Sequence, residues 1–186
     1  MLAGPNGAGK STLAPFLLRD TLGITEYVNA DTLASGLSAF QPESVAMQAG
    51  RIMLKRLREL AAQRANFAFE TTLASRSYAA WISRIRRDGY STHLLFLWLQ
   101  SPDIAIERVK ERVRMGGHDV PEEVILRRYH RGMQNFIEIY SSLVGTWVVY
   151  DNSVAGEPQL IADGEGETIN RILKPDLWKC LCKVEQ

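Results

Sequence analysis

The sequence predicts an α/β protein with a mainly parallel five-stranded sheet, folded as a single domain of 186 residues. Segments with strand character alternate with segments of helical periodicity, which is typical of a parallel sheet whose strands are joined by helices. A glycine-rich segment, GPNGAGKST at residues 4–12, separates the first strand from the first helix. With 46% apolar and 23% charged residues, the chain has the composition of a globular domain with a sizeable core.

Five short apolar segments are expected to form the parallel strands. They are residues 1–3, 25–29, 66–70, 93–99 and 146–150. Because only three residues precede the glycine-rich motif, the first strand is a stub or the chain starts further upstream. Residues 156–186 are expected to form a C-terminal hairpin, with strands at 158–162 and 166–170, and a tail from Lys174 that covers the sheet.

Helical spacing of apolar residues predicts the helices between these strands. They are residues 10–20, 43–63, 76–88, 102–115, 121–131 and 132–143. Residues 43–63 show the pattern through Val45, Ile52, Leu57 and Leu60. Pro102 and Pro121 are each followed by acidic residues, which suits the first turn of a helix.

The motif at residues 4–12 fits G-x-x-x-x-G-K-[ST], the phosphate-binding loop, although a chance glycine-rich turn is the alternative. Its glycines allow a tight turn that points backbone N–H groups at an anion, next to a helix N-terminus. In this interpretation Lys10 reaches the terminal phosphates of ATP and Ser11 is a ligand of Mg²⁺. The residues of this loop expected to bind ATP are Gly4, Asn6, Gly7, Ala8, Gly9, Lys10, Ser11 and Thr12.

Several protein classes are disfavoured. Transporter-type ATPases carry an LSGGQ-like signature and an acid at a strand end, whereas the strand at 93–99 is followed by Gln100, and no guanine-reading motif is present. The net charge of +1 argues against a nucleic-acid partner. The apolar run Leu94–Leu99 is too short to span a membrane, and Cys180 and Cys182 form neither a disulfide framework nor a metal site, so we expect a cytoplasmic protein.

Two carboxylates follow predicted strands, at Asp31 and Glu70. Ligands of parallel sheets bind at the carboxyl ends of the strands, so both side chains are expected near Lys10. A carboxylate beside an acceptor hydroxyl can take its proton during phosphoryl transfer. The alternatives are a helix N-cap for Asp31 and an N-cap neighbour or an ion pair for Glu70.

Three segments, VNADTL, ETTL and RVRMGGHDVPEEVILRRY, resemble the zeta-toxin family of P-loop kinases, in particular its short chromosomal branch. The resemblance covers residues 1 to about 155. It implies a P-loop kinase-like three-layer sandwich with a helical lid at about 108–131, and it implies ATP and Mg²⁺ as cofactors. It also implies Asp31 as catalytic base, Lys10 as phosphate-loop lysine, Glu70 as the carboxylate on the substrate and Mg²⁺ side, and Arg112 and Arg128 as lid arginines, with Arg114 and Arg127 as rivals.

The same resemblance also indicates a candidate substrate and the residues that bind it. Characterised zeta toxins phosphorylate UDP-N-acetylglucosamine, but they are longer than this chain, so the resemblance supports a small-molecule kinase better than a toxin with a small antitoxin partner. The residues expected to bind the substrate are Asp31, Glu70, Thr72, Arg76, His118 and Arg127. Asn152 is expected to line the adenine pocket. The alternatives are a capping or packing role for His118, a solvated Arg76 and an Asx turn at Asn152.

The sequence therefore predicts an ATP- and Mg²⁺-dependent kinase that phosphorylates a hydroxyl group, with a UDP-N-acetylglucosamine-like nucleotide sugar as the first candidate. A kinase of another metabolite is one alternative. A nucleotide-dependent regulatory module without transfer is the other. Gly116 and Gly117 are expected to form the hinge of the lid, and a helix C-cap at Gly116 is the alternative.

Overall fold

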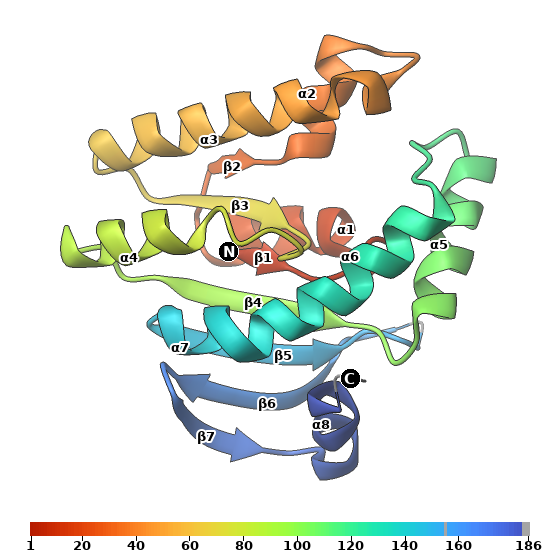
Figure 1. Cartoon of the computed structure of the whole chain (residues 1–186). Helices are drawn as coiled ribbons and strands as arrows, with labels where there is room; N and C mark the ends of the chain where they lie inside the picture. Colours follow the sequence, from red (N-terminus) through yellow and green to blue (C-terminus); the bar gives the residue numbers. More distant parts are fainter. Residues whose placement is uncertain (155, 184–186) are drawn as a thin grey trace. The chain divides into compact units, whose positions relative to one another are not determined.

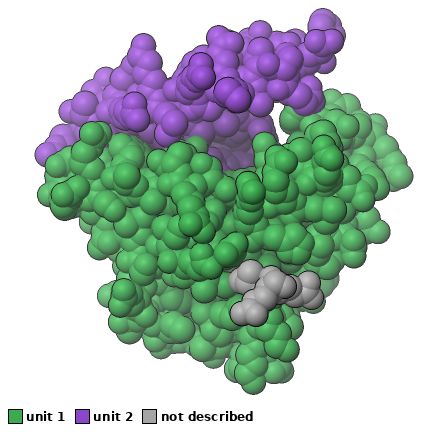
Figure 2. Space-filling view, in the orientation of Figure 1, with its two compact units in different colours: residues 1–10, 72–186 green, residues 11–71 purple. Residues whose placement is uncertain are grey.

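The computed structural model describes residues 1–154 and 156–183, and residues 184–186 of the predicted tail lie outside the described residues. The chain divides into two compact units, which Figure 2 shows in different colours. Unit 1 consists of Met1–Lys10 and Thr72–Gln186, and unit 2 consists of Ser11–Thr71. No helix of the described residues is long and apolar enough to cross a membrane.

Unit 1 contains five strands in the order β1-β4-β5-β6-β7 (Figure 1). They are β1 (Leu2–Ala3), β4 (His93–Trp98), β5 (Thr146–Asp151), β6 (Gln159–Glu165) and β7 (Thr168–Ile172). The pairs β1–β4 and β4–β5 are parallel, whereas β5–β6 and β6–β7 are antiparallel. The predicted C-terminal hairpin is therefore present, and it extends the sheet of unit 1 as antiparallel strands.

The helices of unit 1 follow the predicted order up to α7, with one correction, and a further helix, α8, forms in the segment that was expected to be a tail. They are α4 (Ala79–Arg87), α5 (Pro102–Arg114), α6 (Glu122–Asn135), the π-helix η3 (Phe136–Tyr140), α7 (Ser141–Leu143) and α8 (Pro175–Cys182). Residues 121–131 and 132–143 were expected to be separate helices, but α6, η3 and α7 form one uninterrupted helical run. Gly132 does not break the run, because it is buried where the helix touches the backbone of Thr72.

Aromatic side chains fill the core of unit 1. β4 is apolar along almost its whole length, as expected for a central strand covered on both faces. The ring of Phe96 stacks on Phe136 at 4.8 Å, and Phe136 meets the edge of Trp147 at 5.8 Å. Trp147 in turn stacks on Trp178 of α8 at 5.6 Å. The tail after Lys174 therefore packs on the sheet, as the sequence predicts.

Unit 2 pairs two parallel strands, β2 (Glu26–Val28) and β3 (Phe67–Thr71), with Val28 opposite Phe69. Its helices begin with α1 (Lys10–Ala14), whose first residue belongs to unit 1. They continue with the π-helix η1 (Pro15–Thr21), α2 (Ala30–Leu37), the 3₁₀-helix η2 (Pro42–Val45) and α3 (Ala46–Ala62). The helix α3 buries Ala49, Met53, Leu57 and Leu60, which confirms the predicted apolar face at its last two positions and places Met53 rather than Ile52 in the core.

The described residues therefore form seven strands where five parallel ones were expected, and the two additional strands are the hairpin. The α/β class is confirmed. The β1 strand is a stub of two residues, and this is sufficient because its backbone pairs with the long central strand β4 in register Leu2 to Leu95.

The aromatic core of unit 1 gives a first prediction. Phe136 is fully buried between Phe96 and Trp147, so Phe136→Ala should lower the free energy of unfolding by about 3–5 kcal/mol. Phe40→Ala is the matched control, because Phe40 is 98% exposed and its loss should change stability by less than about 0.5 kcal/mol. Urea unfolding measures both, and an equal effect of the two substitutions would contradict the packing described here.

Candidate active site

The predicted phosphate-binding loop connects β1 to α1, and the boundary between the two units falls inside it, between Lys10 and Ser11. In unit 1, Gly4 has φ +142°, and a Cβ atom there would lie 2.1 Å from the carbonyl oxygen of Leu97 on β4. Gly9 has φ +84°, and its Cβ would lie 2.8 Å from Nδ2 of Asn152. Gly4 therefore requires glycine for both conformation and space, whereas at Gly9 the positive φ is the main constraint, because the Asn152 side chain can shift.

Lys10 and Asn6 place polar groups at this loop although both residues are almost completely buried. The Lys10 ammonium donates to the carbonyl oxygens of Gly4 at 2.9 Å and Pro5 at 2.8 Å, so its side chain curls over the loop. The buried Oδ1 of Asn6 has no hydrogen-bond partner among the described residues. Buried polar atoms are usually paired, so this one marks a position where a ligand group would complete the site.

A turn after β5 supports the loop from the side. The Asn152 side chain donates to the carbonyl oxygen of Ala8 at 2.8 Å. Asp151 fixes this turn, because its carboxylate accepts from the backbone and hydroxyl of Ser153 and, at 2.7 Å, from Nε2 of Gln100. The structure thus places Asn152, predicted to line the adenine pocket, directly on the phosphate-binding loop.

Arg108 of α5 was missed by the sequence analysis, although it contacts both the loop and the supporting turn. Its guanidinium donates to the carbonyl oxygen of Ser153 at 2.9 Å and, more weakly, to that of Gly7 at 3.4 Å. A further contact explains Gly7, whose Cβ would lie 2.8 Å from the carbonyl oxygen of Ala105. No motif marks Arg108, because its role depends on how α5 packs on the loop.

In unit 2, Glu70 near the end of β3 is the centre of a hydrogen-bond cluster. A single carboxylate oxygen, Oε2, accepts from Ser11 Oγ at 2.9 Å, from the Tyr27 hydroxyl at 2.5 Å and from Asn29 Nδ2 at 2.8 Å. Burial, followed by the charge of Glu70, raises the pKa of Tyr27, so its hydroxyl stays protonated and remains a donor. Ser11 and Glu70 were predicted from the sequence as site residues, whereas Tyr27 and Asn29 were not.

Asn29 also connects this cluster to Asp31. Its Oδ1 caps α2 by accepting from the backbone N–H groups of Asp31 at 2.8 Å and Thr32 at 3.4 Å. The alternative role for Asp31, a helix N-cap, is therefore wrong, because Asn29 is the N-cap of α2. Among the described residues, the Asp31 carboxylate has no hydrogen-bond or ion-pair partner, and it is only partly buried. The Asp31 carboxylate is thus accessible, and the Asn29 side chain connects the backbone of Asp31 to Glu70.

The predicted lid corresponds to α5, a short loop and α6, all in unit 1. The N–H of Gly116 donates to Val113 O and the N–H of Gly117 donates to Arg112 O, with Gly116 at φ +84°. These two hydrogen bonds and the positive φ form a Schellman motif at the end of α5. The structure therefore shows the alternative role of Gly116, as part of the helix C-cap. Arg112 Nη2 donates to the carbonyl oxygen of His118 at 2.7 Å, while its buried Nε has no partner among the described residues.

The other predicted lid arginines differ in their surroundings. Arg114 is exposed and pairs with Glu111 of its own helix at 3.0 Å. Arg127 is exposed on α6, whereas Arg128 is half-buried and has an interaction partner. An ion pair between Lys110 and Glu122 at 3.1 Å joins α5 to α6. Such an exposed pair contributes little to stability, so the two arms are held together mainly by packing.

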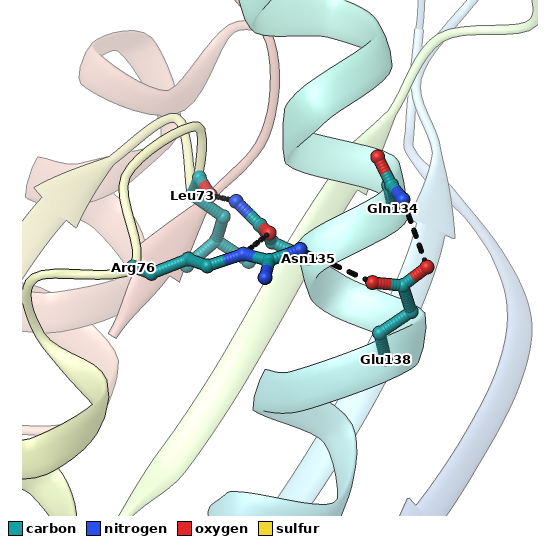
Figure 3. A network of polar contacts seen from close by, with 5 residues as sticks. All are labelled: Leu73, Arg76, Gln134, Asn135 and Glu138. Carbon is teal, nitrogen blue, oxygen red and sulfur yellow. Dashed lines mark hydrogen bonds and ion pairs between the residues drawn. The ribbon is translucent and has the colours of Figure 1, made fainter.

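Two predicted substrate residues lie on the segment after β3, and a third lies in the loop between α5 and α6. Thr72 and Arg76 belong to residues 72–78, which lead into α4. Arg76 donates to Asn135 at 3.0 Å and pairs with Glu138 at 3.2 Å, so two of its guanidinium nitrogens are already used (Figure 3). His118 is half-buried, and its carbonyl oxygen anchors Arg112.

A family model described as an AAA domain (AAA_33) matches residues 1–135. The chain belongs to this family. An uncharacterized protein of Haemophilus influenzae is 29% identical to this AAA domain protein over 126 residues, covering 68% of this chain and 88% of the relative.

Solved structures with the same fold include chains of the AvrRxo1-ORF1:AvrRxo1-ORF2 complex. One, solved with sulphate ions, has a TM-score of 0.80 at 15% identity, and one, solved with ATP, has a TM-score of 0.77 at 16% identity. Each comparison covers the whole of this AAA domain protein, which spans only 63% of the other chain. A chain of the PezAT chromosomal toxin–antitoxin system of Streptococcus pneumoniae has a TM-score of 0.64 at 16% identity, with 96% and 76% of the chains covered. These matches confirm the P-loop kinase-like fold expected from the resemblance to zeta toxins.

The AAA domain offers groups that fit a nucleoside triphosphate. The loop glycines let the loop pack directly against Leu97, Ala105 and Asn152, and the buried Asn6 Oδ1 has no hydrogen-bond partner among the described residues. Ser11 Oγ and the Glu70 carboxylate provide the oxygen ligands that Mg²⁺ prefers, and Mg²⁺ commonly completes its shell with substrate phosphates and waters.

The close approach at Gly4 gives a second prediction. Gly4→Ala should weaken ATP binding by at least about tenfold, because the loop must move away from the β4 backbone to remove the overlap. Gly89→Ala is the matched control: its φ of +93° is equally unfavourable for alanine, but its Cβ meets open space. Titration with a fluorescent ATP analogue measures the affinity, and unchanged affinity in Gly4→Ala would contradict the tight cradle.

A third prediction separates two roles of Asn152. If its amide braces the loop, Asn152→Leu should weaken ATP and inorganic tripolyphosphate binding by similar factors, about three- to tenfold, because one hydrogen bond to the loop is lost. If it reads adenine, the substitution should change the preference for ATP over GTP and leave tripolyphosphate binding unaffected. Competition titrations with the three compounds distinguish these outcomes, and the structure favours the first.

Proposed function

We propose that this AAA domain protein is an ATP- and Mg²⁺-dependent phosphotransferase that phosphorylates a hydroxyl group of a small molecule. The observation that carries the proposal is the chain of contacts from Ser11 through Glu70 and Asn29 to the backbone of Asp31. It links the hydroxyl of the phosphate-binding motif to two carboxylates. A protein that only switches between nucleotide states has no need of an acceptor base.

The proposed roles follow from these surroundings. The loop amides and Lys10 bind the phosphates of ATP, and Ser11 and Glu70 hold Mg²⁺, which neutralises phosphate charge when it is bound. Asp31, whose carboxylate has no partner among the described residues, orients the acceptor hydroxyl and takes its proton. Tyr27 and Asn29 hold Glu70 in place, so the carboxylate pays little reorganisation when the reactants bind.

The lid arginines complete the proposed site. Arg112 and Arg128, with Arg114 and Arg127 as rivals, neutralise charge on the phosphoryl group during transfer. The orphaned buried Nε of Arg112 supports its part, because a guanidinium N–H without a partner is ready to meet an anion. The exposure of Arg114 and its pairing within its own helix make it the weaker candidate.

We propose UDP-N-acetylglucosamine or a related nucleotide sugar as the first acceptor to test, on the basis of the resemblance to zeta toxins. Thr72 and His118 are the proposed contacts on the acceptor side, besides Asp31 and Glu70. Because the related structures come from a toxin–antitoxin system and from a two-protein complex, a small protein partner is part of the proposal. A cytoplasmic location completes it.

Mass spectrometry tests the proposal. A metabolite extract incubated with the protein, ATP and Mg²⁺, alongside a reaction with pure UDP-N-acetylglucosamine, should show one compound that gains a phosphate. A gain on a different metabolite would identify the acceptor and exclude the nucleotide sugar. ATP hydrolysis without any phosphorylated acceptor would instead favour the regulatory module.

A fourth prediction concerns Asp31. Asp31→Asn preserves its volume but removes the base, so kcat for transfer should fall by about 10²- to 10⁴-fold while ATP affinity stays within about twofold. Asp20→Asn is the control, because Asp20 is an exposed carboxylate that pairs only with the neighbouring Arg19 in the described structure. Full transfer activity in Asp31→Asn would exclude Asp31 as the base.

A further inference from the structure

Residues 72–76, which follow β3 and lead toward α4, are in contact with the helical run α6–η3 at several points. Leu73 has φ +57° although it is not glycine, and its side chain is completely buried. Such a conformation costs on the order of 1–3 kcal/mol and persists only where the surroundings enforce it. The segment therefore adopts a strained backbone conformation that other residues must stabilise.

Asn135, at the end of α6, provides the central contact. Its side chain is almost completely buried, and both of its polar groups are used on this segment. Nδ2 donates to the carbonyl oxygen of Leu73 at 2.7 Å, and Oδ1 accepts from Nε of Arg76 at 3.0 Å (Figure 3). One amide thus clamps the strained residue and the arginine three positions further along.

Neighbouring contacts extend the clamp. Arg76 also pairs with Oε2 of Glu138, whereas Gln134 donates to the other oxygen, Oε1, at 2.8 Å and lies outside the clamp (Figure 3). The Tyr140 hydroxyl donates to the carbonyl oxygen of Ser75 at 2.6 Å. The helix approaches so closely that a Cβ on Gly132 would lie 2.4 Å from the carbonyl oxygen of Thr72. Thr72, Leu73, Ser75 and Arg76 are therefore all in contact with the same helical run.

We infer that Asn135 is a positioning residue for the acceptor substrate, acting through the segment 72–76. Arg76 then belongs to the clamp rather than to the direct substrate contacts, because two of its nitrogens already bind Asn135 and Glu138. The inference rests on the proposed function, in which Thr72 contacts the acceptor. Since Arg127 and Arg128 lie on the same α6, the helix that carries lid arginines also fixes an acceptor-side segment.

The primary variant is Asn135→Asp. It keeps the size of the side chain and the acceptor for Arg76 but replaces the donor to Leu73 with a carboxylate oxygen that repels the carbonyl. We expect faster hydrogen exchange in a peptide covering residues 72–78, a rise of about tenfold in the acceptor KM, and an ATP KM within about twofold of wild type. The acceptor probe is UDP-N-acetylglucosamine or, if that is not phosphorylated, the compound identified from the metabolite extract.

Gln134→Ala is the matched control, because Gln134 is the adjacent residue and, in the network of Figure 3, contacts Glu138 and not the segment 72–76. It should leave both hydrogen exchange at 72–78 and the acceptor KM unchanged. Arg76→Gln is the second variant. Because the Arg76 side chain is 63% exposed, we expect this variant to fold even if Asn135→Asp does not. It should loosen the segment and raise the acceptor KM in the same direction, by about threefold.

The outcomes separate this inference from the proposed function. If the wild-type protein phosphorylates no acceptor, the proposed function fails, and the positioning role fails with it. If the wild type transfers phosphate and Asn135→Asp or Arg76→Gln loosens residues 72–78 without changing the acceptor KM, only the positioning role is overturned. A raised acceptor KM without faster exchange would overturn the role through the segment and return Arg76 to direct substrate contact.

Discussion

The three hydrogen bonds to one oxygen of Glu70 are the constraint on which the site in unit 2 depends. They connect the end of β3 to Ser11 in the first turn of α1, to Tyr27 in β2 and to Asn29, which directly follows β2. Hydrogen bonds to an ionised carboxylate are stronger than those between neutral groups, and removing the carboxylate would leave all three donors without their acceptor. Glu70 therefore has a structural role besides the chemical role proposed for it, so a substitution there mixes the two effects. Asp31 provides the cleaner test of chemistry, because none of the described residues relies on its side chain.

The phosphate-binding loop of unit 1 is held from three directions before any ligand binds. β4 lies against Gly4, the turn after β5 holds Ala8 through Asn152, and α5 contacts Gly7. A loop fixed in this way can present its N–H groups without reorganising, and such preorganisation is the main electrostatic contribution in many enzymes. The apolar core therefore serves the site directly, since the position of β4 is set by the stacked rings of Phe96 and Phe136.

The sequence predicts the parts of the site that have local signatures. Glycine spacing predicts the loop, and the positions of the carboxylates after strands predict Asp31 and Glu70 as site residues. Tyr27, Asn29 and Arg108 could not be found in this way, because their roles follow from tertiary packing. Asn29 offered one local signal, because an asparagine at the start of a helix is a favoured N-cap. Its contact with Glu70 depends on the tertiary structure.

The fold shows the same limit. Alternating patterns predict the strands and most helices, but Gly132 gave no sign that α6 continues through it into η3. Glycine lowers helix propensity by about 1 kcal/mol relative to alanine, which favours a break when only local preferences are considered. Here the close approach to the Thr72 carbonyl leaves no space for a side chain, so packing outweighs propensity.

The π-helical turn η3 explains how one helical run can hold several points of the segment 72–76. In an α-helix, the period of 3.6 residues turns positions five apart toward clearly different faces. In a π-helix the hydrogen bonds join residues five apart, so such residues lie nearly above one another. The change of winding after Asn135 therefore brings Tyr140 toward the face that Asn135 presents, and both contact the segment, at Ser75 and Leu73. An uninterrupted α-helix would direct one of these side chains elsewhere, so the irregular winding is what allows the clamp to form.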